Sequence, residues 1–183
     1  AGRGPLAGPV VAAVAVIDRG AAKRRLLKLI DDSKKLELED REAAYEAMVS
    51  SGIVSFGLGE ATVEEIDRVN ILQATYLAMR RAVQALPVPP DMVLVDGNRV
   101  PPQLGCRAEP LVGGDALSYS IAAASIFAKV TRDRAMLKLA EAYPGYGWET
   151  NRGYGTSEHL AALQRLGPTP HHRMTFAPLN RRS

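Results

Sequence analysis

The chain has 183 residues, of which 46% are hydrophobic and 23% are charged, and it contains a single cysteine, Cys106. These values exclude a disordered protein and an intrachain disulfide framework, and the longest apolar run, Val10–Ile17, is too short to cross a bilayer. The 23 Lys and Arg residues exceed the 20 Asp and Glu residues by a net charge of +3, which permits a nucleic-acid partner without requiring one.

Strand and helix patterns alternate through the first part of the chain. The β-branched run Val10–Ile17 follows a loop rich in glycine and proline, and it predicts a buried strand. Ala22–Ile30 and Glu39–Ser50 predict helices, and Ile53–Gly59 alternates in the manner of a strand.

The second part of the chain is predicted to be mostly helical. Thr62 and Glu65 have the spacing of a capping box, so a helix is expected to start at Thr62. The further predicted elements are a helix at Ile71–Leu86, a strand at Met92–Val95, a short strand at Leu111–Val112, one long or two stacked helices over residues 115–143, and a helix at Ser157–Leu166. This alternation indicates a single α/β domain over residues 1–183 with a mixed sheet, in which residues from about 145 onward form a helical and basic extension.

Two acidic residues are the first candidates for chemistry. Asp96 directly follows the strand Met92–Val95, and ligands of α/β sheets collect beyond the carboxyl ends of strands, although an Asp-Gly pair also starts tight turns. Asp115 follows two glycines at a predicted helix start, where it is a candidate N-cap as well as a candidate metal ligand. The two residues are far apart in the sequence, so only the fold can bring them together.

Several other residues are candidates for contact with a nucleic acid. The backbone of Gly2, Arg3 and Gly4 can approach a phosphate or a sugar closely, although a plain turn also explains this motif. Tyr154 stands between two glycines, where it is presented for stacking on a base or sugar or anchors a loop. The polar and basic candidates for substrate contact, each of which a solvated surface also explains, are Ser33, Lys34, Lys35, Asn98, Ser125, Lys129, Arg132 and Arg173.

Two further patterns carry weaker information. Ser125, Lys129 and Asp133 recur every four residues and are expected to share one face of a helix. The three histidines lack the spacing of metal ligands, so we expect them to be structural or to face phosphate.

In order and spacing, these segments resemble bacterial ribonuclease HII across almost the whole chain. The similar segments are AGRGPLAGPVVAAVAVI from Ala1, DDSKKL from Asp31, EEIDRVNILQATYLAMRRAV from Glu64, VLVDGNR from Val93, GGD from Gly113, SIAAASIFAKVTRDR from Ser120, NRGYGT from Asn151 and HHRMTF from His171. No single string decides the resemblance, but their order over the chain makes it specific.

The resemblance implies a ribonuclease H-like fold, with a mixed five-stranded sheet flanked by helices and a helical C-terminal segment. It implies an endoribonuclease that cleaves the RNA strand of RNA–DNA hybrids and the 5′ side of single ribonucleotides in duplex DNA, leaving a 3′-hydroxyl and a 5′-phosphate. The family uses four carboxylates with Mg²⁺ or Mn²⁺, and two of them correspond to Asp96 and Asp115. The family's ribose-contacting loop corresponds to Gly2, Arg3 and Gly4, and its stacking tyrosine corresponds to Tyr154.

The other two carboxylates of the family, an Asp-Glu pair, stand immediately before the AGRG segment, and this sequence opens at Ala1. A catalytically impaired hybrid-binding fragment is therefore an alternative interpretation. A small-molecule nucleotide-binding enzyme is a third, but the loop lacks the G-x-x-x-x-G-K-[ST] spacing and precedes a strand. We find no signal peptide, and we expect a cytoplasmic monomer that has no membrane partner.

Overall fold

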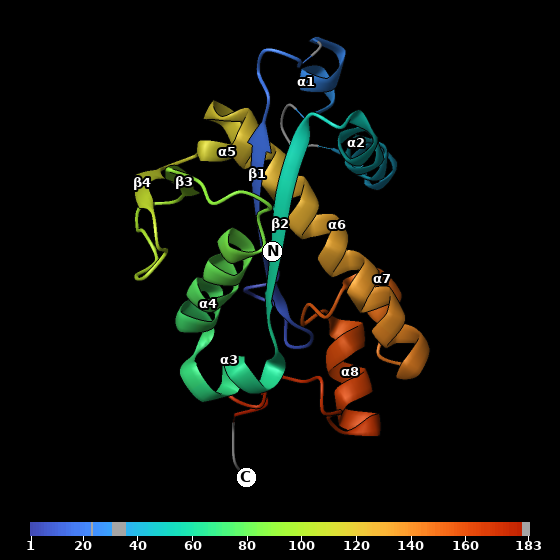
Figure 1. Cartoon of the computed structure of the whole chain (residues 1–183). Coiled ribbons are helices and arrows are strands. Elements are labelled where there is room, and N and C mark those ends of the chain that lie inside the picture. Colours follow the sequence, from blue (N-terminus) through green and yellow to red (C-terminus); the bar gives the residue numbers. More distant parts are fainter. Residues whose placement is uncertain (23, 31–35, 181–183) are drawn as a thin grey trace.

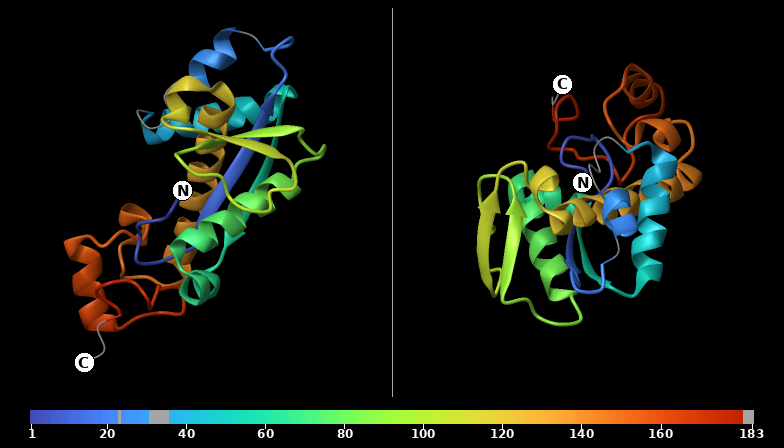
Figure 2. Two further views of the ribbon diagram at one scale, coloured as in Figure 1. Left: turned by 90° about the vertical axis from the view of Figure 1, so that its left-hand side faces the viewer. Right: turned by 90° about the horizontal axis from the view of Figure 1, so that it is seen from above.

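The computed structural model describes residues 1–22, 24–30 and 36–180 of the chain. Within these ranges the elements follow one another as β1 (Val10–Ile17), α1 (Arg24–Ile30), α2 (Leu38–Ser51), β2 (Val54–Ala61), α3 (Val63–Val69), α4 (Ile71–Gln84), β3 (Met92–Asp96), β4 (Arg107–Leu111), α5 (Gly114–Leu117), α6 (Tyr119–Ala142), α7 (Trp148–Asn151) and α8 (Ser157–Leu166). The long helix α6 runs from the end of the molecule that holds α1 and α2 to the end that holds α7 and α8 (Figures 1 and 2).

The strands β1 and β2 form an antiparallel pair at the centre of the fold, with Val10 opposite Ala61 at one end of the ladder. Side chains of a strand point alternately to its two faces. Accordingly, Ala15 of β1 packs in the core under α6, whereas Ala12 packs in the core under α4. One apolar strand therefore serves two cores, which explains its continuous run of apolar residues.

Helix α6 covers one face of this pair together with α1 and α2. Phe127 of α6 is fully buried and stacks on Phe56 of β2, with 4.0 Å between the ring centroids. Tyr45 of α2 meets the same phenylalanine edge to face at 5.3 Å. These aromatic contacts fix the position of α6 against the sheet.

Helix α4 covers the opposite face and approaches β2 through two glycines. A Cβ at Gly57 would lie 2.1 Å from the carbonyl oxygen of Ala82, and a Cβ at Gly59 would lie 2.0 Å from that of Ala78. Because both neighbours are backbone atoms, only glycine permits this close packing.

The strands β3 and β4 form a second, parallel pair beside the first (Figure 1). The sequence predicted a strand at Leu111–Val112, but β4 spans Arg107–Leu111. This strand is largely exposed and includes Pro110, which an edge strand tolerates because its outer face needs no backbone donor. Most of β4 is polar, so its sequence does not show the apolar pattern that predicts a strand.

The chain after α6 returns to the N-terminal loop. Trp148 of α7 is fully buried in a core formed with residues of α6 and α8. The amide of Gly8 donates to the carbonyl of His171 over 2.9 Å, and the amide of Arg173 donates to the carbonyl of Leu6 over 2.8 Å. The first residues of the chain and the segment around His171 therefore lie side by side.

The α/β class, the flanking helices and the helical C-terminal part are confirmed, as is the capping box of Thr62 and Glu65. The expected five-stranded sheet is corrected in one respect, because the described residues form two separate pairs of strands. Over residues 115–143, Ser118 caps α6 and separates it from the short helix α5. No helix in the described part of the chain is long and apolar enough to cross a membrane.

Candidate active site

Asp96 is the last residue of β3, and its carboxylate is exposed. Its Oδ1 accepts a hydrogen bond from the amide of Gly114, the first residue of α5, over 3.0 Å. The neighbouring Gly97 closes the turn by donating its amide to the carbonyl of Leu111 over 3.0 Å. The carboxylate of Asp96 therefore bridges to another element, which the interpretation as a plain tight turn does not explain.

Asp115 follows Gly114 directly and lies in the first turn of α5, where it is half-buried. The structure corrects the alternative interpretation of Asp115 as an N-cap. Gly113, with a φ of 68°, occupies the N-cap position of α5, and the side chain of Ser118 caps α6. The fold thus brings the Asp96 carboxylate to Gly114, the residue that precedes Asp115 in the chain.

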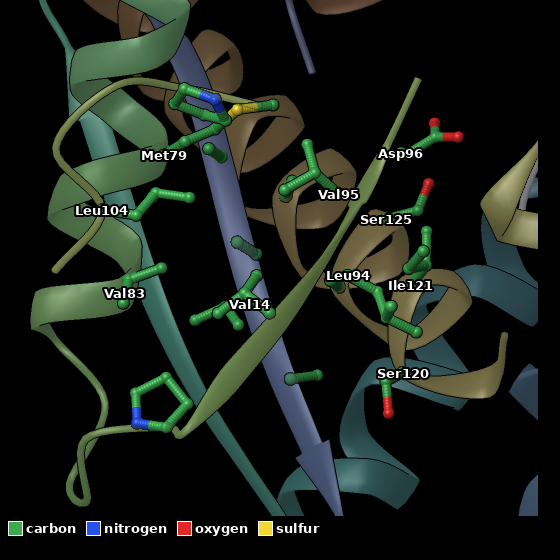
Figure 3. Close-up of a pocket in the computed structure, with 18 of the residues that line it drawn as sticks. Val14, Met79, Val83, Leu94, Val95, Asp96, Leu104, Ser120, Ile121 and Ser125 are labelled. Carbon is green, nitrogen blue, oxygen red and sulfur yellow. The ribbon is translucent and has the colours of Figure 1, made fainter. Parts of the chain in front are cut away.

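A cavity of about 540 Å³ lies between β1 and β3, which run in opposite directions (Figure 3). Val14 of β1 and Val95 of β3 are among the apolar side chains that line it. Asp96 and Ser125 lie at one end, on the side where β1 begins (Figure 3). The open edges of the two strand pairs therefore face each other across an apolar groove that ends at Asp96.

Ala1 lines the same cavity and pairs with the edge of β1. Its backbone nitrogen donates to the carbonyl of Val11 over 2.6 Å, and the amide of Val11 donates to the carbonyl of Ala1 over 3.0 Å. Such a reciprocal exchange is the pattern of directly opposed residues in an antiparallel ladder.

The glycine loop begins at the same place. Gly2 is buried with a φ of 85°, a conformation that favours glycine, whereas Arg3 and Gly4 are exposed. Tyr154, on the loop after α7, is 47% exposed, and its ring lies 3.7 Å from the position that a Cβ on Gly4 would occupy. The structure therefore places the predicted stacking ring beside the predicted ribose-contacting loop.

Two of the predicted phosphate contacts need correction. Arg132 is 1% exposed and Arg173 is 0% exposed, and among the described residues the guanidinium groups of both donate to backbone carbonyls. A side chain in this position cannot reach a phosphate at the surface. Burial, followed by repulsion from Arg132, lowers the pKa of the Arg173 guanidinium to about 9, so it remains charged at neutral pH.

The other candidates are placed as follows. Ser125, Lys129 and Asp133 lie on one face of α6, as expected, and the Lys129 ammonium lies 2.7 Å from the Asp133 carboxylate. Asn98 is exposed two residues after Asp96. Ser33, Lys34 and Lys35 lie outside the described residues.

Sequence reasoning missed the hydrogen-bonded chain formed by the buried histidines. Trp148 Nε1 donates to His159 Nε2 over 3.0 Å, and His159 Nε2 lies 3.0 Å from His172 Nε2. His172 Nδ1 accepts from the amide of Thr169 over 2.9 Å, and His159 Nδ1 lies 2.9 Å from the carbonyl of Tyr154. His159 is 0% exposed and His172 is 1% exposed, so these two histidines are structural and do not face phosphate.

The hydrogen bonds also fix the tautomers of the two rings. Because Nδ1 of His172 accepts from Thr169, its proton is on Nε2 and is donated to His159. The single lone pair of His159 Nε2 is then shared between the two donors, Trp148 and His172, and the proton of His159 is on Nδ1, which donates to the carbonyl of Tyr154. Both rings are therefore neutral, and the chain of bonds ends at the backbone of the exposed tyrosine.

The donor chemistry of the site suits a hard divalent cation, because Asp96 and Asp115 offer carboxylate oxygens. Two carboxylates do not complete such a site. Among the residues that the structure describes, no group of three or more His, Cys, Asp or Glu side chains could hold a metal ion. Further oxygen ligands are therefore required beside Asp96 and Asp115.

Comparison with known proteins identifies the family. The family model for ribonuclease HII matches residues 1–179. The chain is 63% identical over 178 residues to ribonuclease HII of Rhodospirillum rubrum, covering 97% of this chain and 81% of the relative. It superimposes on the crystal structure of ribonuclease H2 from Pyrococcus horikoshii with a TM-score of 0.78 and 28% identity, covering 98% of this chain and 92% of the other.

A more distant likeness supports the fold alone. The structure of Bst-RNase HIII in complex with Mn²⁺ has a TM-score of 0.75 and 21% identity, covering 98% of this chain and 66% of the other. The family model and the closely similar R. rubrum enzyme carry the assignment of function class. The chain belongs to the ribonuclease HII family and is a ribonuclease H hydrolase.

Proposed function

We propose that this protein is a metal-dependent endoribonuclease that cleaves the RNA strand of RNA–DNA hybrids and the 5′ side of single ribonucleotides in duplex DNA. The products are a 3′-hydroxyl and a 5′-phosphate. The observation that carries the proposal is the hydrogen bond from Gly114 to Asp96, because it joins the Asp96 carboxylate to the turn that holds Asp115. Membership of the ribonuclease HII family supports the substrate class.

The surface beside the two carboxylates offers groups that suit a ribonucleotide in a duplex. Arg3 lines the same cavity as Asp96, and the exposed Gly4 lies beside the ring of Tyr154. The 2′-hydroxyl is the chemical difference between RNA and DNA at one nucleotide, so a protein that distinguishes the two must form a hydrogen bond with it. A glycine loop lets the backbone come close enough, and an adjacent ring can stack on a base or sugar.

The carboxylates of Asp96 and Asp115 would hold Mg²⁺ or Mn²⁺ with further oxygen ligands. When bound, such ions supply an activated water and stabilise the leaving oxygen of the phosphodiester. The residues of the chain then hold and orient the scissile phosphate, for which Lys129 and Asn98 remain candidates. Lys129 is partly exposed on α6, and its ammonium pairs with the Asp133 carboxylate over 2.7 Å.

The groove between β1 and β3 could hold the segment that carries the family's other two carboxylates. Residues preceding Ala1 would continue the ladder that Ala1 and Val11 begin, along the open edge of β1 and antiparallel to it. They would therefore occupy the groove of Figure 3, which ends at Asp96. The Asp-Glu pair that the family carries directly before the AGRG segment would then stand beside Asp96.

A nicking assay tests the proposal. The protein, carrying an Asp-Glu-terminated strand before Ala1, is incubated with a DNA duplex that contains one ribonucleotide, in Mn²⁺, in Mg²⁺ and in EDTA. We expect a single nick 5′ of the ribonucleotide in either metal and none in EDTA. Asp96→Asn should abolish nicking and spare binding, whereas Asp91→Asn, at an exposed position before β3, should nick normally.

Three outcomes would each overturn the proposal or part of it. Normal cleavage by Asp96→Asn would show that Asp96 has no part in the reaction. Tight binding without turnover at saturating Mn²⁺ would instead favour a non-catalytic hybrid-binding protein. Binding of a free nucleotide at micromolar concentration, without affinity for the duplex, would favour a small-molecule enzyme.

A further inference from the structure

Two buried arginines lie beneath the loop that precedes β1. Arg132 of α6 donates to the carbonyls of Pro9, Ala7 and Arg152 over 3.0 to 3.1 Å. Arg173 donates to the carbonyls of four loop residues over 2.6 to 3.2 Å, namely Gly2, Arg3, Gly8 and Pro9. One helix and the segment after α8 therefore hold the same short loop from below.

Backbone dipoles, rather than carboxylates, stabilise the positive charges of these two arginines. Among the described residues, no carboxylate forms a salt bridge with Arg132 or Arg173. The negative ends of carbonyl dipoles surround the two guanidinium groups instead, and they satisfy their N–H donors. Every carbonyl that turns inward to an arginine fixes the orientation of its own peptide plane.

Peptide geometry determines the direction of the amides in the glycine loop. In a trans peptide the N–H group points opposite to the C=O group. The carbonyls of Gly2 and Arg3 point inward to Arg173, so the next amides, those of Arg3 and Gly4, point away from it. Neither amide has a hydrogen-bond partner within the described residues, and both residues are exposed.

We infer that Arg132 and Arg173 are positioning residues for ribose recognition, because they hold the glycine loop with the amides of Arg3 and Gly4 presented to the 2′-hydroxyl. This inference rests on the proposed function, and it adds the part of the protein that sets the selectivity for RNA over DNA. Arg132 also fixes the place of Gly2, where a Cβ would lie 2.0 Å from its Nε. Neither arginine touches the substrate.

The test compares conservative variants. Arg132→Lys and Arg173→Lys keep the positive charge and lose the planar fork that spans several carbonyls. Arg134→Lys is the matched control, since Arg134 is also on α6 but binds the carboxylates of Glu42 and Glu46 on α2. For each protein, the Kd is measured for a DNA duplex with one ribonucleotide and for the all-DNA duplex of the same sequence, in Ca²⁺ to prevent cleavage.

We expect the ratio of the two Kd values to fall about fivefold or more in Arg132→Lys and Arg173→Lys, because misplaced amides lose hydrogen bonds to the ribose. The affinity for all-DNA duplex should stay within about twofold, and Arg134→Lys should keep the wild-type ratio. A purely structural role would lower thermal stability without changing this ratio. Folded lysine variants that keep the wild-type ratio would overturn the inference, as would an equal loss in Arg134→Lys.

A second measurement uses the wild-type protein and does not depend on the folding of any variant. Hydrogen exchange at the amides of Arg3 and Gly4 should be fast in the free protein and slowed by the ribonucleotide duplex, but not by the all-DNA duplex. Equal exchange with both duplexes would overturn the inference. A wild-type protein that binds both duplexes with the same Kd would overturn the proposed function instead, so the two failures are distinguishable.

Discussion

The carboxylate of Asp96 accepts a hydrogen bond from the amide of Gly114 over 3.0 Å. This contact connects the end of β3 to the first residue of α5, across the loop that contains β4. Through this contact Asp96 lies beside the turn that holds Asp115, although the two residues are far apart in the sequence. The position of the Asp96 carboxylate therefore depends on the start of α5, the helix that contains Asp115.

Replacing Asp115 by Asn should reduce nicking of the ribonucleotide duplex at least 100-fold in single-turnover assays, because a neutral amide is a much weaker ligand for a hard cation. Duplex affinity should remain within about twofold. Glu109→Gln is a suitable control, since this acidic side chain is exposed on β4. Unchanged nicking by the Asp115 variant would remove this residue from the site.

Replacing Tyr154 by Ala should weaken binding of the ribonucleotide duplex roughly 5- to 150-fold, since stacking of a ring on a base contributes about 1–3 kcal/mol. Tyr154→Phe keeps the ring and should bind nearly as the wild type does. Fluorescence anisotropy with a labelled duplex measures both. Equal losses in the two variants would show that the hydroxyl, and not ring stacking, makes the contact.

The sequence predicted the elements whose patterns are strong and local. The apolar run Val10–Ile17 is β1 with the same bounds, and the capping box at Thr62 starts a helix. The short helix α7 has no periodic pattern, and it was missed because Trp148 is held by tertiary packing against α6 and α8. The strand β4 was largely missed because edge strands tolerate polar residues and proline.

The site was predicted less completely than the fold. The positions of Asp96 and Tyr154 follow from a strand end and a pair of flanking glycines, both of which are visible in the sequence. The burial of Arg132 and Arg173 is not visible there, because a basic residue in a helix or tail is normally exposed. Only the fold shows that the two side chains are turned to the backbone carbonyls of the N-terminal loop.

Acidification from pH 7.5 to 5 should destabilise the protein through the buried histidines. Burial, followed by repulsion from His159, lowers the pKa of His172 from 6.5 to about 4, and burial also lowers the pKa of His159. The stability of the neutral rings is fully present above pH 6.5 and is lost as the pH falls toward 4, because the unfolded chain binds protons that the folded chain excludes. For His172 alone this linkage amounts to roughly 2 kcal/mol at pH 5.

Urea unfolding at a series of pH values measures this loss. His172→Gln should be less stable than the wild type at pH 7.5, but it should lose less stability between pH 7.5 and 5, since the titrating ring is gone. His171→Gln is the matched control, because the neighbouring side chain packs on Tyr143 and lies outside the hydrogen-bonded chain. A His172→Gln variant with the full pH dependence of the wild type would show that other groups cause the acid sensitivity, and that the neutral histidine pair does not control it.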